Sequence, residues 1–268
     1  MAGTAMPRIS MHQPIGRRIR VGVDRLDEAA EHYRQSRCPV ALTGAGISVE
    51  SGIPDFRSPG GLWSVFRPDE YATVQAFRSD PEKAWRLYRA LGEGLIDKAP
   101  SPAHKALAEL ENAGRLEAVI TQNIDGLHSR AGSRRVLEVH GEHQNLQCLG
   151  CGFVRPFTSR DLQPGPVPLC LECRMPLKPN IVLFGELVRE MAAIEATLRK
   201  CDLLLVIGTS AQVYPVASFP YEVIRRGGLV YEFNKEETPL THVADFFFEG
   251  KAGQTVPALA KTLLGQSA

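Results

Sequence analysis

Four of the six cysteines form two C-x-x-C pairs, Cys148 with Cys151 and Cys170 with Cys173. The 18 residues between the pairs fit the spacing of sites in which four thiolates hold one zinc ion. A redox dithiol or chance could explain one pair, but two pairs in a proline-rich segment favour structural zinc. Because four cysteines leave no coordination position open, we expect the metal to stabilise this segment and take no part in chemistry.

A glycine-rich turn, beginning Gly44-Ala-Gly46, follows the apolar run of residues 39–43. Such a turn lets main-chain N–H groups approach a pyrophosphate closely. The dehydrogenase fingerprint G-x-G-x-x-G needs its third glycine at position 49, which is Val49. Alone, G-x-G is a weak signal, and an ordinary turn is an equal alternative. The Asp-Phe-Arg sequence at residues 55–57 strengthens the phosphate-loop interpretation.

Small or polar residues also follow three later apolar runs: residues 121–128 (TQNIDGLH), residues 208–210 (GTS) and Asn234. Ligands of open α/β sheets bind at the carboxyl ends of the strands, so these residues suit a nucleotide. Ordinary turn chemistry explains any one of these segments, but less readily all of them together. His140 follows a further short apolar run. Taken alone, it is more readily a hydrogen-bonded structural histidine than a general base.

Strand-like and helix-like patterns alternate along most of the chain, and this alternation predicts an α/β fold with an open, doubly wound parallel sheet. Residues 148–179 break the alternation with six prolines and four cysteines and predict a small inserted module. The predicted strands are residues 39–43, 116–121, 202–207 and 229–233, and the predicted helices are residues 24–34, 81–96, 102–113, 189–200 and 214–226.

The composition is that of a globular protein, with 268 residues of which 44% are hydrophobic. The 31 Lys and Arg against 30 Asp and Glu give a net charge of +1 and no electrostatic reason to expect binding to nucleic acid or an anionic membrane. The longest apolar stretch, residues 203–208, is too short to cross a bilayer, so we expect a soluble protein.

The first 23 residues lack acids and carry four arginines. We interpret them as a mobile N-terminal arm, with an organelle transit peptide as the alternative. Nothing at the N-terminus of the sequence resembles the apolar region of a secretory signal, and a chain of this size needs no disulfides, so reduced thiols are expected. The predicted location is therefore cytoplasmic, or mitochondrial if the arm is a transit peptide.

These motifs, taken in order, resemble those of the sirtuins, which are NAD-dependent protein lysine deacylases. The resemblance extends from about Val40 to Ala252 and includes Phe184-Gly-Glu186. It implies a Rossmann-like NAD-binding domain over residues 24–141 and 180–268 and a small zinc-ribbon insert over residues 142–179. NAD and an acyl-lysine peptide would enter the cleft between the two from opposite sides.

The resemblance also implies the reaction. The acyl oxygen attacks the ribose carbon that bears nicotinamide, and the acyl group leaves as 2′-O-acyl-ADP-ribose. His140 would be the general base, and an unperturbed imidazole pKa of about 6.5 suits that role near neutral pH. Asn123 and Asp125 would complete the catalytic set. The implied NAD contacts are Gly44, Ala45, Gly46, Asp55, Phe56, Arg57, Trp63, Gln122, Asn123, Asp125, Gly208, Thr209, Ser210, Asn234, Lys235 and Ala252.

Among these, Ala45 and Gly46 would cradle phosphate, Arg57 would cover the cofactor, and Phe56 would shield the reacting carbon from water. On the substrate side, main-chain atoms of Val182 and Gly185, with Phe184 between them, would pair with the peptide as an added strand. Such recognition tolerates many peptide sequences.

One sirtuin branch removes succinyl and malonyl groups with a small alanine and a Tyr-x-x-Arg pair that binds the acyl carboxylate. Ala72 and Tyr88 match that branch, but the arginine position holds Leu91. Arg89, one residue after Tyr88, would be turned about 100° away on a helix and could not substitute. We therefore expect a roomy, uncharged pocket in which acetyl or bulkier neutral acyl groups are favoured over succinyl.

Three alternatives stay open at this point. The same site could support a protein mono-ADP-ribosyltransferase, or an NAD-dependent desuccinylase or demalonylase. The cysteine insert could instead form a zinc-ribbon module that binds nucleic acid or protein, but its four basic residues and two phenylalanines are few for that role. The predicted partners are therefore acyl-lysine proteins or peptides, with no membrane and no specific nucleic acid.

Overall fold

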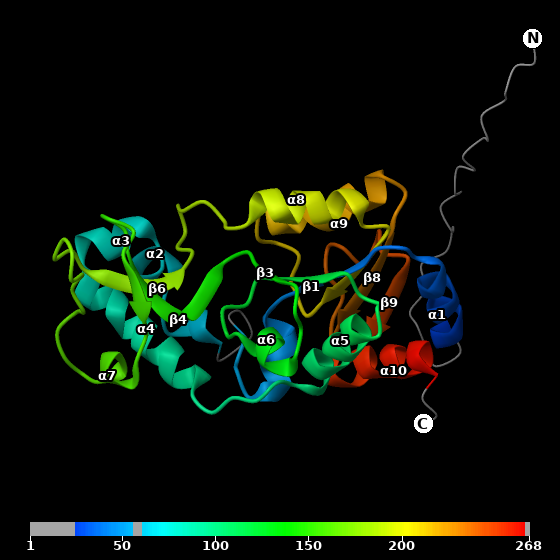
Figure 1. Cartoon of the computed structure of the whole chain (residues 1–268), viewed down its shortest axis with the longest axis horizontal. Helices are drawn as coiled ribbons and strands as arrows, with labels where there is room; N and C mark the ends of the chain where they lie inside the picture. Colours follow the sequence, from blue (N-terminus) through cyan, green and yellow to red (C-terminus); the bar gives the residue numbers. More distant parts are fainter. Residues whose placement is uncertain (1–24, 56–60, 266–268) are drawn as a thin grey trace, which may run out of the picture.

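The computed structural model describes residues 25–55 and 61–265, which form a larger and a smaller lobe (Figure 1), and residues of both lobes line one cavity. In the part of the chain so described, no helix is long and apolar enough to span a membrane. The helices are α1 (Leu26–Gln35), η2 (Ala45–Ser51), η3 (Leu62–Ser64), α2 (Pro68–Tyr71), α3 (Val74–Ser79), α4 (Pro81–Leu95), α5 (Pro102–Asn112), α6 (Leu127–Ala131), α7 (Ser159–Leu162), α8 (Met191–Lys200), η4 (Val216–Ser218), α9 (Phe219–Arg225) and α10 (Ala252–Leu264). The strands are β1 (Pro39–Thr43), β2 (Ala118–Thr121), β3 (Val136–Glu138), β4 (Gly141–Cys148), β5 (Val154–Pro156), β6 (Leu177–Ile181), β7 (Leu203–Ile207), β8 (Leu229–Asn234) and β9 (Phe246–Glu249).

The large lobe is built on a six-stranded sheet in the order β3-β2-β1-β7-β8-β9, in which every neighbouring pair is parallel. The chain reverses direction across the sheet between β1 and β7, so the loops that follow these two strands leave toward opposite edges. In open parallel sheets this reversal creates the crevice in which ligands bind. The sequence prediction of a doubly wound, Rossmann-like sheet is confirmed.

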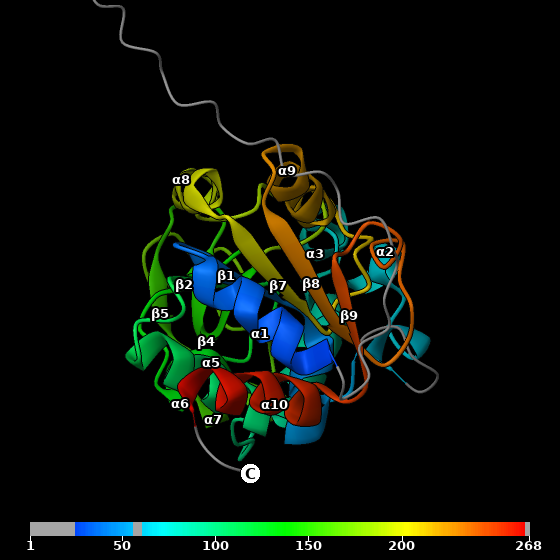
Figure 2. The ribbon, with the colours of Figure 1, turned by 90° about the vertical axis from the view of Figure 1, so that its right-hand side faces the viewer.

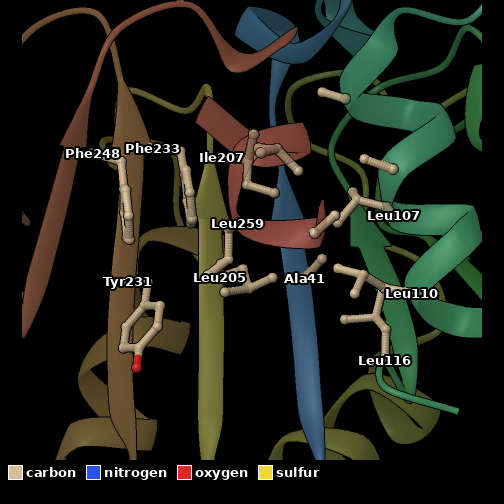
Figure 3. Close-up of a cluster of buried hydrophobic side chains, with 14 of the residues drawn as sticks. Ala41, Leu107, Leu110, Leu116, Leu205, Ile207, Tyr231, Phe233, Phe248 and Leu259 are labelled. Atoms are coloured by element: carbon tan, nitrogen blue, oxygen red, sulfur yellow. The ribbon is translucent and has the colours of Figure 1, made fainter. Parts of the chain in front are cut away.

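Both faces of this sheet are covered by helices, which explains why its strands are apolar throughout rather than alternating. Figure 2 shows α1, α5 and α10 on one side of the strands and α8 and α9 on the other. Successive side chains of a strand point to opposite faces. Accordingly, Ala41 and Leu205 pack with α5 and α10 (Figure 3), whereas Leu42 and Val206 pack with α8 and α9.

The small lobe combines an antiparallel sheet, in the order β5-β4-β6, with helices α2, α3, α4 and α7. Trp85 of α4 is fully buried, and its indole N–H donates to the carbonyl oxygen of Leu177 at 2.8 Å. The side chains of Phe77, Trp85 and Tyr88 join Leu146 and Leu177 in one core cluster. The predicted large unit, residues 24–141, thus contains a segment from α2 to α4 that packs on the small sheet instead.

The elements differ from the predicted ones mainly where proline or irregular backbone intervenes. The prediction of one helix over residues 214–226 is wrong, because a 3-10 turn precedes α9. Pro220 lies in the first turn of α9, where a missing N–H is tolerated. The predicted insert also contains one short helix, α7. The predicted N-terminal arm, residues 1–23, lies outside the described residues.

Candidate active site

Two glycine turns meet where β1 and β7 end. The N–H of Gly44 donates to the carbonyl oxygen of Ile207 at 3.0 Å, and that of Gly46 donates to Gly208 at 2.8 Å. A Cβ atom at Gly46 would lie 2.6 Å from the Cα of Gly208, so a side chain cannot be accommodated there. Ala45 also lines the cavity, and no described main-chain group accepts a hydrogen bond from its N–H. The turn therefore presents bare main chain to a ligand, as a phosphate group requires.

The TQNIDGLH segment after β2 is held by side-chain hydrogen bonds to this first turn. Asn123 Nδ2 donates to the carbonyl oxygen of Gly44 at 3.2 Å and to Ser48 Oγ at 3.1 Å. Ser48 Oγ in turn donates to Asp125 Oδ2 at 2.7 Å, and Asp125 Oδ1 accepts from the N–H of Leu127 at 2.9 Å. These contacts fix the orientation of the Asn123 amide, which lines the cleft, and leave its side-chain oxygen available to a ligand.

His140 lies in the cleft between the two lobes with its tautomer defined by one hydrogen bond. Its Nδ1 lies 3.0 Å from the carbonyl oxygen of Gln122. Because a carbonyl oxygen can only accept, Nδ1 carries the proton and Nε2 keeps its lone pair. Burial lowers the pKa of His140 below its usual value, although the bond to Gln122 opposes this. The imidazole is therefore neutral, with Nε2 ready to act as a base, at neutral pH.

Polar contacts also connect this histidine to the ends of β7 and β8. Gln122 Nε2 donates to Thr209 Oγ1 at 2.9 Å, and Asn234 Nδ2 donates to the carbonyl oxygen of Thr209 at 2.9 Å. Four strand ends that the sequence predicted to share a ligand thus lie on one continuous surface.

A single cavity of about 600 Å³ runs along the cleft, a volume typical of small-molecule and cofactor sites. Most of the predicted NAD and substrate residues line it. They are Gly44, Ala45, Gly46, Asp55, Trp63, Ala72, Leu91, Gln122, Asn123, His140, Val182, Phe184, Gly185, Gly208, Thr209, Ser210, Asn234, Lys235 and Ala252.

Two of the predicted NAD and substrate residues that the structure describes, Asp125 and Tyr88, do not line this cavity. Asp125 is linked to the cavity indirectly, through Ser48, which accepts from the cavity-lining Asn123. Tyr88 is fully buried between Phe77 and Trp85, and its hydroxyl has no hydrogen-bond partner in the described structure. Two further predicted residues, at positions 56 and 57, lie outside the described residues.

The structure adds residues that sequence reasoning missed. Leu87 lines the cavity one helical turn before Leu91, so the i, i+4 spacing on α4 was an available signal. Tyr88 is turned about 100° from Leu87, which directs it into the core. Ser48 belongs to the quoted glycine motif, yet only the fold shows that it joins Asn123 to Asp125.

The predicted peptide-binding segment forms one wall of the cavity. The N–H of Val182 donates to the carbonyl oxygen of His140 at 2.8 Å. The N–H of Phe184 donates to the carbonyl oxygen of Ala72 at 2.9 Å, and the N–H of Val74 donates back to Phe184 at 3.1 Å. Both main-chain groups of Phe184 are therefore hydrogen-bonded within the protein, while Val182 and Gly185 lie on either side of it on the cavity wall.

The four paired cysteines gather at one end of the small sheet. The sulfur atoms of Cys148 and Cys173 lie 3.4 Å apart, those of Cys151 and Cys170 lie 3.5 Å apart, and all four lie within 4.8 Å of one another. Zn–S bonds of about 2.3 Å in a tetrahedron place sulfurs about 3.8 Å apart, so the set fits one zinc ion. The cysteines do not line the cavity, as expected of a structural metal.

The fold and the cleft together define an NAD-binding α/β enzyme with a structural zinc module. The profile of the Sir2 family matches residues 44–215, and the chain belongs to this family. An NAD-dependent protein deacylase of Thermococcus kodakarensis is 44% identical over 243 residues, which cover 88% of this chain and 95% of that protein.

Solved structures agree with this assignment. A Sir2 homologue in complex with NAD has a TM-score of 0.83 and 42% identity, and the match covers 90% of this chain and 98% of that one. Sir2Af2 bound to a myristoylated histone peptide has a TM-score of 0.74 and 36% identity, with 90% and 97% covered.

Proposed function

We propose that this protein is an NAD-dependent protein lysine deacylase that acts on neutral acyl groups in preference to succinyl. The observation that carries the proposal is the position of His140. Its basic Nε2 belongs to a cavity that has glycine turns on one side and the Val182–Gly185 segment on the other. A dinucleotide and an acylated peptide can therefore reach the same base from opposite directions.

NAD would supply an electrophilic ribose carbon once nicotinamide leaves. The N–H of Ala45 would hold its phosphates, Gly46 would let them approach because it has no side chain, and the Asn123 amide, fixed by Ser48, would orient the nicotinamide end. His140 Nε2 would take a proton from a ribose hydroxyl, and its Nδ1–H bond to Gln122 would stabilise the imidazolium that results. Asp125 would act indirectly, by holding Ser48.

The acyl preference is supported by the chemistry of the cavity wall in the small lobe. Six aliphatic side chains in or against the core cluster contribute to it: Ala72, Leu87, Leu91, Ile124, Ile181 and Leu183. Among the described lining residues the only Lys or Arg is Lys235, beside Asn234 at the nucleotide end. Arg89 points away, since it donates to the carbonyl oxygen of Gly165 at 2.8 Å. Burial of an unpaired carboxylate on such a wall would cost several kcal/mol, on the order of a thousandfold in binding.

The deciding experiment assays one lysine peptide carrying acetyl, longer neutral acyl or succinyl groups, with nicotinamide release and the acyl product read together. We expect 2′-O-acyl-ADP-ribose from every good substrate, and a higher kcat/KM for neutral acyl groups than for succinyl. Faster desuccinylation would contradict the pocket argument. Transfer of labelled ADP-ribose from adenine-labelled NAD onto protein, with nicotinamide released and no acyl-ADP-ribose formed, would instead identify a mono-ADP-ribosyltransferase.

His140→Ala tests the assignment of the base. We expect deacylation to be abolished while NAD binding stays nearly intact, because the glycine turns that hold the dinucleotide do not depend on the imidazole. In the wild-type enzyme, the low pKa of His140 places the acid limb of kcat/KM below pH 6.5. Unchanged turnover in the variant would remove His140 from the mechanism.

A further inference from the structure

A buried lysine lies directly behind the peptide side of the cleft. Lys178 is in β6, and its side chain is completely inaccessible to solvent. Its ammonium donates to the carbonyl oxygens of Ile181 at 2.5 Å and Pro179 at 3.3 Å and pairs with Glu186 Oε2 at 3.0 Å. Three acceptors thus match the three N–H donors of the ammonium. A buried charge is tolerated only when it is paired in this way, so the arrangement is strongly constrained.

The same carboxylate closes a loop of main chain. Glu186 Oε2 also accepts from the N–H of Leu183 at 2.8 Å, and the N–H of Glu186 donates to the carbonyl oxygen of Leu183 at 2.9 Å. The ammonium therefore joins the start of this stretch, at Ile181, to its end, at Glu186. Val182 and Gly185 lie between these anchors, on the cavity wall.

We propose that Lys178 is a positioning residue for the acyl-lysine peptide. The ammonium fixes the main-chain conformation of Val182–Gly185 from the side opposite the cavity and does not contact the peptide. Without it, the carbonyl oxygen of Ile181 loses a donor, and the Glu186 carboxylate, whose side chain is 21% exposed, turns toward water. The segment must then be ordered during peptide binding, which weakens that step. NAD binding uses the glycine turns and is unaffected. The inference rests on the proposed deacylase function.

The test compares Lys178→Met with Arg155→Met. Methionine keeps the apolar stem of Lys178 and removes the charge, and we expect the KM for an acetyl-lysine peptide to rise about tenfold, since a hydrogen bond to a charged group is lost. The KM for NAD should change less than twofold. Arg155 is a matched control because it pairs with Asp161 at 2.6 Å and donates to the carbonyl oxygen of Pro156 at 2.8 Å in the same small sheet. Its loss should leave the peptide KM unchanged.

Glu186→Gln provides a second variant if Lys178→Met does not fold, as judged by thermal unfolding. The amide oxygen still accepts from Leu183, but the ion pair is lost, so the peptide KM should again rise selectively. Peptide affinity, measured by fluorescence anisotropy without turnover, should weaken in parallel.

A measurement on the wild type needs no substitution. Burial lowers the pKa of Lys178 to about 8, with Glu186 opposing and Arg189 adding to the effect. Tyr88 also faces Glu186, and burial raises its pKa well above this range. Peptide affinity in the wild type should therefore fall as the pH rises above about 8.

The outcomes separate the two hypotheses. Folded variants with unchanged peptide KM, or with equal rises in the peptide and NAD KM values, would overturn the role of Lys178 and leave the deacylase assignment standing. A wild-type protein that releases no nicotinamide in response to acylated peptide would overturn both.

Discussion

Introducing an arginine at position 91 should give the cavity an affinity for acidic acyl groups. Leu91 lies near the end of α4 on the face that lines the cavity, one turn after Leu87. In Leu91→Arg, the guanidinium would lie on the apolar wall, where a succinyl chain would place its carboxylate. The long arginine stem can pack along the same apolar surface that Leu91 covers.

The expected size of this effect follows from the groups nearby. A charge-assisted, two-pronged contact between arginine and carboxylate contributes about 1.5–3 kcal/mol, which is about tenfold to a hundredfold in kcat/KM. Glu186 also lines the cavity and would compete for the new guanidinium, but it is already paired with Lys178 at 3.0 Å. Tyr88 adds nothing, because it is buried away from the cavity. We therefore expect a gain near the lower limit, about tenfold for succinyl relative to acetyl.

The assay is the ratio of kcat/KM for succinyl and acetyl forms of one peptide, measured for the wild type, Leu91→Arg and Leu91→Met. Methionine is the matched control because it keeps the volume and carries no charge. The reasoning fails if folded Leu91→Arg leaves the ratio unchanged, or if Leu91→Met shifts it as much.

Three further predictions concern the metal, the glycine turns and acid stability. Removal of zinc by a chelator should unfold the small lobe and abolish peptide-dependent turnover, as followed by circular dichroism and activity, whereas full activity without metal would show that the lobe is stable alone. Gly46→Ala should destabilise the fold by about 1–3 kcal/mol and raise the KM for NAD, because its Cβ would overlap Gly208 at 2.6 Å. Gly94→Ala, with nothing within 4 Å of the added Cβ, is the control and should not destabilise. Burial lowers the pKa of His104 and His143 from 6.5 to about 4, so the unfolded chain binds more protons than the folded one between these values. The free energy of unfolding, from denaturant titrations, should therefore fall as the pH drops below 6.5, by about 1.4 kcal/mol per pH unit for each histidine. A flat profile from pH 7 to 4 would contradict the burial of these rings.

The best predicted elements are those whose sequence pattern reflects burial on both sides. The predicted strand at residues 39–43 coincides with β1, and that at residues 202–207 begins one residue before β7. No pattern singled out α10, whose sequence contains Gly253 and Pro257, residues that weaken helices. Its apolar side packs against the main sheet, and this tertiary contact outweighs the weak local preference.

The residues of the candidate site also fall into two groups, those that the sequence pointed to and those that only the structure placed. The glycine turns and the cysteine pairs were recognisable because their chemistry depends on residue type and short spacing, whereas the role of His140 was predicted only from the resemblance of the whole motif set to the sirtuins. The orientation of Tyr88 could not be predicted from the sequence. The i, i+3 spacing places Tyr88 and Leu91 on one face of the helix but does not say which of the two side chains reaches the cavity. The contacts that aim Asn123 run through Ser48, which is 75 residues away in the chain.

Sequence patterns were enough to predict the class of fold, the four cysteines as zinc ligands and, through the resemblance to the sirtuins, His140 as the base, since these predictions depend on local pattern and on the chemistry of single side chains. Only the tertiary structure decided which face of α4 lines the cavity and that Lys178 lies buried with its charge paired to Glu186. Burial and pairing arise from contacts between segments distant in the chain, and such contacts set how costly a charge is and where it can act.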